Sequence, residues 1–289
     1  DNDESHIEIK RIHLHNIDRV VVAAMPAIST PVLMSFLDAG IPVFFVSSRG
    51  MWRGSLLPDN NPNSARRIRQ YECSEDNDFS LRISKALICA KLKNSKRVLQ
   101  RLASNRQLTD DRDYLECCKE LKNLADKVEK EECYLDIVRG YEGIGAAIYF
   151  NQLSRFFPKT MPFVHRDRRP PKDAANALLS WTYTILLGEL ETALRIHGLD
   201  VGIGNMHRDR TRASSLALDL MEPLRPAIAD LLVLNIANHG ILNSKDHFYS
   251  DNENGGVYLN QEGRSAFFTA YDLAMNRRFV SLENHHETD

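Results

Sequence analysis

Apolar residues recur at helical spacing over most of this chain, and this feature most constrains the fold that the chain can adopt. One stretch places Leu115, Cys118 and Leu121 three residues apart and continues to Val128, with Lys and Glu on the opposite face. Similar patterns cover residues 65–71, 76–102, 110–133, 134–156, 173–197, 212–222, 224–238 and 262–279. We therefore expect residues 65–289 to form an all-α domain.

The first 64 residues differ, because short apolar runs alternate there with turns. Strands are predicted over residues 7–17, 19–25, 41–48 and 52–57. Thr30-Pro31 suits the start of a short helix and Gly40 its end. Asp59-Asn-Asn-Pro-Asn-Ser64 consists of residue types that favour turns, and we place a domain boundary there. The predicted fold class is α+β, a small N-terminal β-rich α/β domain over 1–64 followed by a larger all-α domain over 65–289.

Charge and hydropathy argue against a membrane protein. The chain has a net charge of −2, 26% charged residues and a mean hydropathy of −0.36. No run approaches the ~18 apolar residues that a membrane-spanning helix needs. The first residues, Asp1-Asn-Asp-Glu4, do not resemble a secretion signal. We expect a cytoplasmic protein with no membrane partner, which binds any nucleic acid through local basic clusters.

Glu142 stands out because it lies inside a helical stretch of small and apolar residues. Gly143, Gly145 and Ala146 follow it and would let a second helix approach closely. A carboxylate buried in this way is costly unless it meets a cation, a proton or a metal ion. The alternative interpretation is a glutamate on a solvated stripe beside Arg139.

Three further residues could act with Glu142. His207 follows a glycine-bearing loop after the helix that stops near His197-Gly198, although a single histidine is more often structural than a ligand. Asp219 and Glu222 are three residues apart on one predicted helix and therefore share a face. Pro223 then ends or kinks that helix. Each of these signals is weak alone.

Together, the carboxylates and the imidazole form a set that holds Mg²⁺ or Mn²⁺ with positions open for water and substrate. Basic residues near them are Arg166, Arg168, Arg169 and Lys172 in one cluster, and Arg208, Arg210 and Arg212 in another. Pro170-Pro171 stiffens the first cluster, which we expect to point away from the core. Carboxylates beside arginines indicate phosphodiester chemistry. The alternative is surface ion pairs with Asp167, Asp173 and Asp209.

These residues, with others along nearly the whole chain, resemble the CRISPR-associated spacer-acquisition integrases, the "Cas one" family. The most specific shared element is Asp219-Leu-Met-Glu-Pro-Leu-Arg-Pro226 after an isolated His207, with Glu142-Gly143 upstream. The other shared elements are Asp18-Arg-Val-Val-Val22, Gly40-Ile-Pro-Val43, Ser48-Arg-Gly50, Arg69-Gln-Tyr71, Ser84-Lys-Ala86, Ala90-Lys-Leu-Lys-Asn94, Tyr149-Phe150, Arg168-Arg-Pro-Pro-Lys-Asp173, Asn176-Ala-Leu-Leu-Ser180, Gly256-Val-Tyr-Leu259 and Glu262-Gly-Arg264.

The resemblance implies an N-terminal β-rich domain and a C-terminal α-helical catalytic domain. It implies Mg²⁺ or Mn²⁺ held by Glu142, His207 and Glu222, with Asp219 as a partner of the ligands or a supplementary ligand. The implied reaction is attack of a DNA 3′-OH end on a phosphodiester of the CRISPR repeat. DNA contacts are expected at Arg166, Arg168, Arg169, Lys172, Arg208, Arg212 and Arg225.

The resemblance also implies partners. Such proteins dimerise and act with the small "Cas two" protein on double-stranded and partly single-stranded DNA. We expect a homodimer that uses the strand edges at Val20–Val22 and Val43–Phe45. Family members usually begin with two further strands, so we expect a longer parent chain, and a "Cas four" nuclease or a reverse transcriptase can form such an extension. Two alternatives stay open: a casposon-type transposon integrase, and a non-catalytic subunit that only holds DNA.

Overall fold

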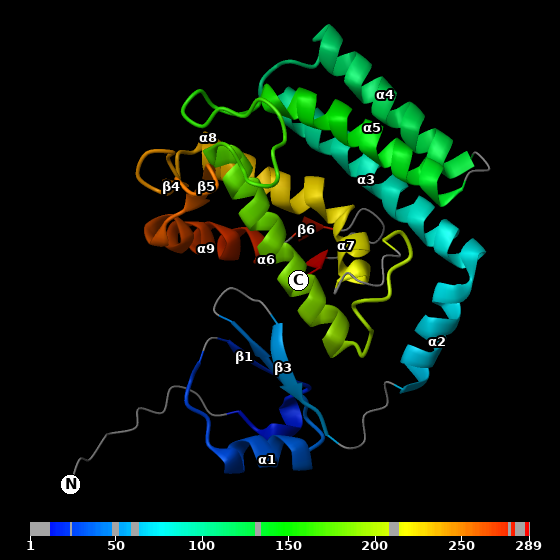
Figure 1. The fold of residues 1–289 in the computed structure, drawn as a ribbon, viewed down its shortest axis with the longest axis vertical. Coiled ribbons are helices and arrows are strands. Elements are labelled where there is room, and N and C mark those ends of the chain that lie inside the picture. Colours follow the sequence, from blue (N-terminus) through cyan, green and yellow to red (C-terminus); the bar gives the residue numbers. More distant parts are fainter. Residues whose placement is uncertain are drawn as a thin grey trace.

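The structure, a computed structural model, combines a small sheet with a larger set of helices, so the predicted α+β class is confirmed (Figure 1). It describes residues 12–23, 25–47, 52–58, 64–130, 134–207, 214–276, 279–280 and 287–288. Within these residues, none of the helices is long and apolar enough to cross a membrane. The division into two domains at residue 64 stays a prediction.

A three-stranded sheet forms the N-terminal part. Its elements are β1 (Val20–Ala23), α1 (Thr30–Asp38), β2 (Val43–Val46) and β3 (Trp52–Leu56). β2 is central, because β1 pairs with it in parallel and β3 pairs with it antiparallel. α1 makes the crossover between the two parallel strands and ends at Gly40, whose φ of +73° suits glycine. Ile41, Val43 and Phe44 are buried, and because Val43 and Phe44 are adjacent in β2 they point to opposite faces of the sheet.

Two N-terminal predictions are wrong. Leu14–Asn16 form a 3₁₀ turn, closed by the bond from the Asn16 N–H to the His13 carbonyl, where a half-exposed strand over 7–17 was predicted. Alternating apolar residues fit a turn equally well when no neighbouring strand pairs with them; residues 7–11 lie outside the described part. Because β2 is paired on both sides, Val43–Phe45 offers no free edge for a dimer. Among the described residues, no strand pairs with the outer edge of β1.

Helices make up most of the rest of the chain. They are α2 (Ser64–Glu75), α3 (Asn77–Asn105), α4 (Arg112–Lys130), α5 (Leu135–Ser154), α6 (Ala174–Ile196), α7 (Ser215–Met221), a π-helix (Arg225–Asp230), α8 (Leu231–Asn238) and α9 (Gln261–Met275). The helical spacing did not predict the two short hairpins, β4 (Phe248–Asp251) with β5 (Gly256–Leu259) and β6 (Phe279–Val280) with β7 (Glu287–Thr288). Each hairpin strand is only two to four residues long, too short for a period to be read.

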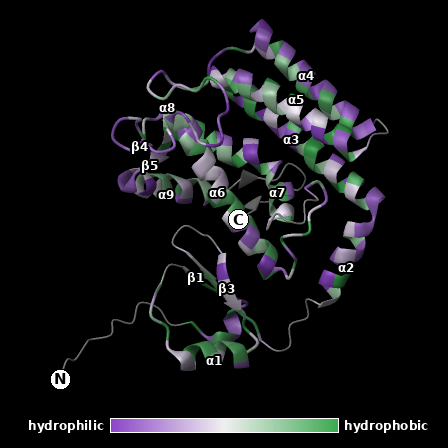
Figure 2. Cartoon of the chain, viewed as in Figure 1, coloured by the Kyte–Doolittle hydropathy of each residue, from purple (hydrophilic) through white to green (hydrophobic). Residues whose placement is uncertain are grey.

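Helices α3, α4 and α5 pack side by side, with polar residues on their outer faces (Figure 2). The apolar stripe read from the sequence forms this core, and Leu92, Leu121 and Val128 are buried in it. Gly145 lets α5 approach α3, because a Cβ there would lie 2.2 Å from a Leu92 methyl group. Gly143 has no such role, since it is exposed and has free space around it. Of these two glycines, only Gly145 therefore permits the close packing of α5 against α3.

Helix α6 links the helices to the sheet. Its first half is almost wholly buried and packs against the π-helix, α8 and β5. Near its end, the guanidinium of Arg195 lies 4.8 Å from the ring centre of Trp52 in β3. The segment from 197 to 207 then leads away from α6 toward α7.

Candidate active site

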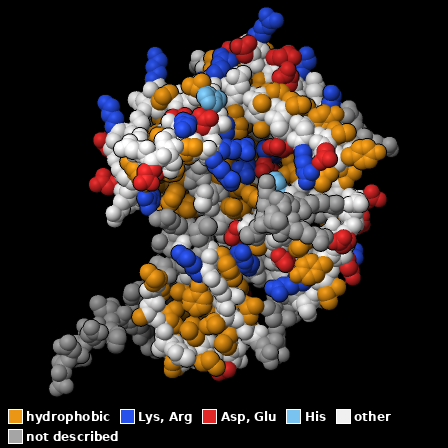
Figure 3. Space-filling view, in the orientation of Figure 1, with side chains coloured by type: hydrophobic (Ala, Val, Ile, Leu, Met, Phe, Trp, Pro, Cys, Tyr) orange, Lys and Arg blue, Asp and Glu red, His pale blue; other side chains and the backbone are white. Residues whose placement is uncertain are grey.

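A pocket of about 400 Å³ opens where α3, α5, α6 and the segment from α7 to the π-helix meet. Figure 3 shows basic side chains gathered on this face, with acidic side chains beside them. The three ligands implied by the resemblance all line the pocket: Glu142, His207 and Glu222. So do the basic residues Lys91, Arg166, Arg168, Arg169 and Arg225. Residues far apart in the sequence thus meet at one site.

Lys91 lies between the two glutamates. Its ammonium contacts Glu142 Oε1 and lies 2.5 Å from Glu222 Oε2. The side chains of Lys91 and Glu222 are 11% and 8% exposed, and that of Glu142 is 26% exposed. Glu142 is therefore neither fully buried nor on a solvated stripe, but at the wall of the pocket. Sequence reasoning missed Lys91 as a site residue; the available signal was a lysine inside the apolar run from Ile88 to Leu92.

Glu222 is held in the ionised form. It follows the last residue of α7, and its Oε1 accepts a hydrogen bond from Arg225 Nε at 3.2 Å. Burial by itself would favour the neutral acid, but the charges of Lys91 and Arg225 outweigh it and lower the pKa of Glu222 below its usual value. A buried anion is thus available on the pocket wall at neutral pH.

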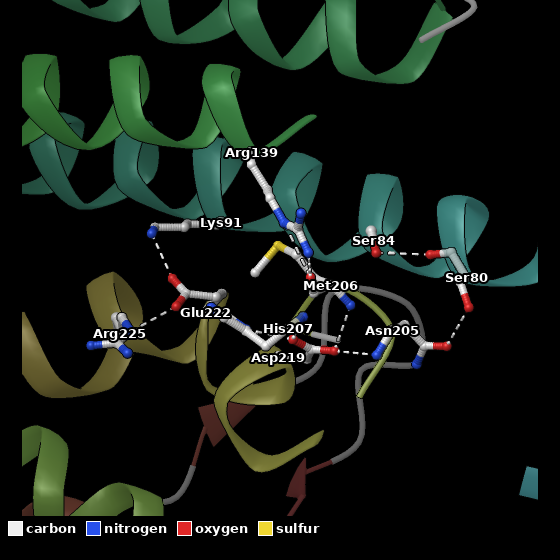
Figure 4. Close-up of polar contacts among 10 residues, drawn as sticks. All are labelled: Ser80, Ser84, Lys91, Arg139, Asn205, Met206, His207, Asp219, Glu222 and Arg225. Carbon is white, nitrogen blue, oxygen red and sulfur yellow. Dashed lines mark hydrogen bonds and ion pairs between the residues drawn. The ribbon is translucent and has the colours of Figure 1, made fainter. Parts of the chain in front are cut away.

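Asp219 organises the loop that carries His207 (Figure 4). It is fully buried, and its Oδ2 accepts the backbone N–H groups of Asn205 at 2.6 Å and Met206 at 2.8 Å. Its Oδ1 accepts the N–H of His207 at 3.0 Å and lies 2.6 Å from the ring Nδ1. Because the carboxylate oxygen accepts, Nδ1 is the donor in this contact, and Nε2 is the ring nitrogen left for another partner. A carboxylate partner of this kind is typical of histidines that bind metal ions.

The donor chemistry fits a divalent ion, although the side chains are arranged around an ammonium. Among the described residues, no three His, Cys, Asp or Glu side chains converge closely enough to hold a metal ion. Lys91 nevertheless marks a position at which one cation touches both Glu142 and Glu222. Two carboxylates with an imidazole are a set suited to Mg²⁺ or Mn²⁺. Glu142, His207 and Glu222 thus have the donor chemistry for such an ion, but in this structure they are not close enough together to form its site.

Arg166 differs from the sequence-based expectation, because it does not point away from the core. Its guanidinium donates to Asn176 Oδ1 at 2.8 Å and to Ser180 Oγ at 2.9 Å, both on α6. It also lies over the ring of Tyr183, on which the Arg225 guanidinium lies as well, at 5.5 and 4.5 Å from the centroid. Pro170-Pro171 did not turn it outward, since its two terminal nitrogens bind the amide and the hydroxyl on α6.

The other basic residues of the first cluster are exposed: Arg168, Arg169 and Lys172. The aspartates proposed as their alternative partners are engaged elsewhere. Asp173 caps α6 by accepting the N–H of Asn176 at 2.7 Å, and Asp167 lies 3.1 Å from His165 Nε2. The second cluster, with Arg208, Arg210, Arg212 and Asp209, lies outside the described residues.

A buried carboxylate that the sequence did not reveal lies at the inner end of the pocket. Asp230, the last residue of the π-helix, is 1% exposed and accepts the Tyr183 hydroxyl at 2.5 Å. Burial raises the pKa of Asp230 to about 6. Nothing in its neighbourhood in the sequence marks it as buried, because its partner lies on α6.

The pocket combines carboxylates, a histidine anchored by a carboxylate, and arginines. This combination is typical of enzymes that act on the phosphodiesters of nucleic acids. The family model of the CRISPR associated protein Cas1 matches residues 2–273. The chain belongs to the Cas1 family, and it is thus an enzyme of the nuclease and integrase kind.

Relatives and solved structures agree. The chain is 34% identical over 262 residues to "CRISPR-associated endonuclease Cas1 1" of Thermodesulfovibrio yellowstonii, covering 90% of this chain and 80% of that protein. It is 32% identical over 278 residues to a "CRISPR-associated exonuclease Cas4/endonuclease Cas1 fusion" of Rhodospirillum rubrum, covering 93% of this chain and 46% of the fusion. A casposase bound to integration product has a TM-score of 0.74 at 26% identity, over 96% of this chain and 78% of that one. A partial Cas6-RT-Cas1–Cas2 complex has a TM-score of 0.78 at 25% identity, over 92% and 79%.

Proposed function

We propose that the protein is a metal-dependent integrase of CRISPR adaptation, which joins the 3′-OH ends of short DNA duplexes to phosphodiesters of the CRISPR repeat. The observation that carries this proposal is the convergence of Glu142 and Glu222 on one cation, the ammonium of Lys91. Two buried or half-buried carboxylates that already share a cation suit Mg²⁺ or Mn²⁺ beside a phosphate. Family membership supplies the class of substrate.

The roles of the residues follow from their contacts. Glu142, His207 and Glu222 would hold the ion, and a bound ion would supply activation of the attacking oxygen and stabilisation of negative charge on the phosphate. Asp219 fixes the ring of His207 and so keeps Nε2 directed to the site. The attacking 3′-oxygen forms the new bond to phosphorus and loses its proton to solvent, while the old P–O3′ bond breaks and the leaving 3′-oxygen takes a proton from solvent. The protein supplies no covalent nucleophile.

Basic side chains orient the DNA in this proposal. Arg168, Arg169 and Lys172 are exposed at or near the mouth of the pocket and bind backbone phosphates. Arg225 and Arg166 are held against Tyr183, and they present fixed positive charge to the reacting phosphate. Arg208 and Arg212 stay in the proposal as phosphate contacts beside His207.

The partners proposed are a second copy of this chain, the Cas2 protein, and a Cas4 nuclease or reverse transcriptase. Support comes from the names of similar proteins, which include a Cas4/Cas1 fusion and a Cas6-RT-Cas1–Cas2 complex. The outer edge of β1, which no strand of the described part of the chain covers and where Val21 is 47% exposed, is the surface proposed for the homodimer. The domain that supplies it spans residues 1–64, and residues 65–289 form the catalytic domain.

A casposon-type integrase is the second candidate function, favoured by the similarity to a casposase bound to integration product. A strand-transfer assay separates the two. Short duplexes with 3′-OH ends are presented to supercoiled plasmids with and without a CRISPR repeat, with and without Mn²⁺ and Cas2. We expect metal-dependent joining at the repeat. Joining that ignores the repeat would favour the casposase-like role, and no joining under any condition would overturn both.

A further inference from the structure

Helix α2 lies against the segment that leads to His207, although it belongs to a distant part of the sequence (Figure 1). Two of its arginines donate to the carbonyls left open at the end of α6: Arg66 to His197 O and Arg67 Nε to Gly198 O, the latter at 3.1 Å. Carbonyls at a helix C-terminus have no partners within the helix, so these bonds fix the position at which α6 ends and the segment begins.

Gln70 binds the next part of the segment through both ends of its carboxamide. Its Oε1 accepts the N–H of Asp200 at 2.8 Å, and its Nε2 donates to the carbonyl of Asp200 at 2.8 Å. The same Nε2 donates to the carbonyl of Ile203 at 3.4 Å. The neighbouring Tyr71 donates its hydroxyl to Asp200 Oδ2 at 3.1 Å. Gln70 thus pairs with the segment as a strand would pair with its neighbour.

The far end of the segment is held just as closely, beginning one residue after Ile203. A Cβ on Gly204 would lie 2.9 Å from the Ser215 backbone and 3.0 Å from Asp219 Oδ2, so no side chain fits there. Arg139 on α5 donates to the Met206 carbonyl, and Asp219 holds the N–H of His207. Because both ends of the segment are held by these contacts, a displacement of Asp200 or Ile203 should also displace His207.

We propose that Gln70 is a positioning residue for His207, and that its carboxamide fixes the segment so that the imidazole stays bonded to Asp219 and directed into the pocket. The function of His207 as a ligand rests on the proposed function, but the position of its ring does not. The proposal also gives a role to Gln70 within Arg69-Gln-Tyr71, an element that the proposed chemistry leaves unused.

The test compares Gln70→Leu, which removes all three bonds, with Gln70→Glu, which keeps only the acceptor for Asp200 N–H. Arg69→Ala is the matched control on the same helix, because Arg69 is exposed and pairs only with the nearby Glu72 at 3.0 Å. Leu121→Ala in the core of α3 and α4 is the second control, since it destabilises the fold far from the segment. All variants are made in the full chain.

Two measurements report on the ring. The first is the NMR signal of the His207 Nδ1–H proton at one fixed pH, with His207→Ala for assignment. The second is the dissociation constant for Mn²⁺ alone, measured by electron paramagnetic resonance. We expect Gln70→Leu to lose or shift the proton signal and to weaken Mn²⁺ binding about 10-fold or more, as loss of a ligand's supporting partner does. Gln70→Glu should lie between Gln70→Leu and the wild type.

The controls decide the interpretation. If Gln70→Leu changes neither measurement more than Leu121→Ala does, Gln70 contributes only to stability and the proposal is wrong. If Gln70→Leu does not fold, the same comparison is made with Gln70→Glu. Wild-type Mn²⁺ binding by His207→Ala would refute the ligand role in the proposed function, while the proton signal would still test Gln70.

Discussion

Asp219 holds His207 by its ring and by its backbone at once, with Oδ1 at 2.6 Å from Nδ1 and 3.0 Å from the backbone nitrogen. The carboxylate is fully buried and also accepts two further backbone N–H groups. It therefore acts on the shape of the loop as well as on the imidazole. This relationship explains why Asp219, three positions before Glu222, does not line the pocket although Glu222 does.

Asp219→Asn should weaken the loop and the metal site together. Each carboxylate oxygen accepts from two donors, so whichever end becomes an amide leaves two donors without an acceptor. We expect a loss of about 1–3 kcal/mol in the free energy of unfolding and a ~10–100-fold loss of Mn²⁺ affinity. Urea unfolding and a metal titration measure the two effects. Complete loss of strand transfer with unchanged stability would instead make Asp219 a ligand.

Glu142→Ala, His207→Ala and Glu222→Ala should each abolish metal-dependent strand transfer. Removing a ligand should cost more than the ~10–100-fold that loss of a ligand's partner costs. Circular dichroism should show an intact fold. Glu129→Ala is the control, because that glutamate is exposed on α4, outside the pocket, and pairs with Lys93 and Cys89 on α3. Wild-type turnover at saturating Mn²⁺ by any of the three variants would remove that residue from the ligand set.

Lys91→Met should make the stability of the protein depend on metal. Without the ammonium, Glu142 and Glu222 lose a shared cation in a mostly buried site, which should lower the free energy of unfolding by roughly 3 kcal/mol. Mn²⁺ then binds without competition, and ligand binding to the folded state raises Tm. We expect a lower Tm in EDTA and a larger rise with Mn²⁺ than in the wild type.

The control for this comparison is Lys93→Met, two residues along α3, where the lysine is half exposed and pairs with Glu129 at 3.0 Å. It should leave the response of Tm to Mn²⁺ unchanged. An equal response in Lys91→Met and Lys93→Met would show that the ammonium does not occupy a cation site.

Arg168→Ala and Arg166→Ala should separate DNA binding from structure. Arg168 is exposed, so its loss should lower the slope of log affinity against log salt by about 0.9 on duplex DNA, with Tm unchanged. Arg166 is bonded to Asn176 and Ser180, so its loss should lower Tm. Fluorescence anisotropy over a salt series and thermal melts measure both. An unchanged slope and a lowered Tm for Arg168→Ala would make it a structural residue.

Asp230→Asn should remove a pH dependence of stability. The folded state raises the pKa of Asp230 to about 6, above the value of ~4 expected in the unfolded chain. The folded state therefore binds more protons between these values, and this group makes the protein less stable as pH rises from 4 to 6. The variant should gain stability relative to the wild type over that range, by up to ~3 kcal/mol. Urea unfolding at pH 4.5, 5.5 and 6.5 checks this, and a constant difference would contradict it.

The helical spacing predicted α3 to α6 within a few residues, because a long amphipathic pattern repeats enough times to fix its period. The alternation of apolar residues wrongly predicted a strand at Leu14–Asn16, and the helical spacing did not predict β4–β5. These elements are too short for a period to be distinguished. The carboxylates and His207 were found from their chemistry and from the resemblance. Lys91 and Asp230 were not, because their roles depend on partners more than 40 residues away.

The sequence by itself determined the α+β class, the order of the long helices and the residue types able to bind a metal ion. These follow from local patterns, since the repeat of apolar residues and the identity of a side chain need no knowledge of neighbours. Only the tertiary structure decided that Lys91 bridges Glu142 and Glu222, that Arg166 turns inward, and that α2 holds the segment before His207. Those contacts join distant parts of the chain, and they depend on how closely the helices pack rather than on any local sequence pattern.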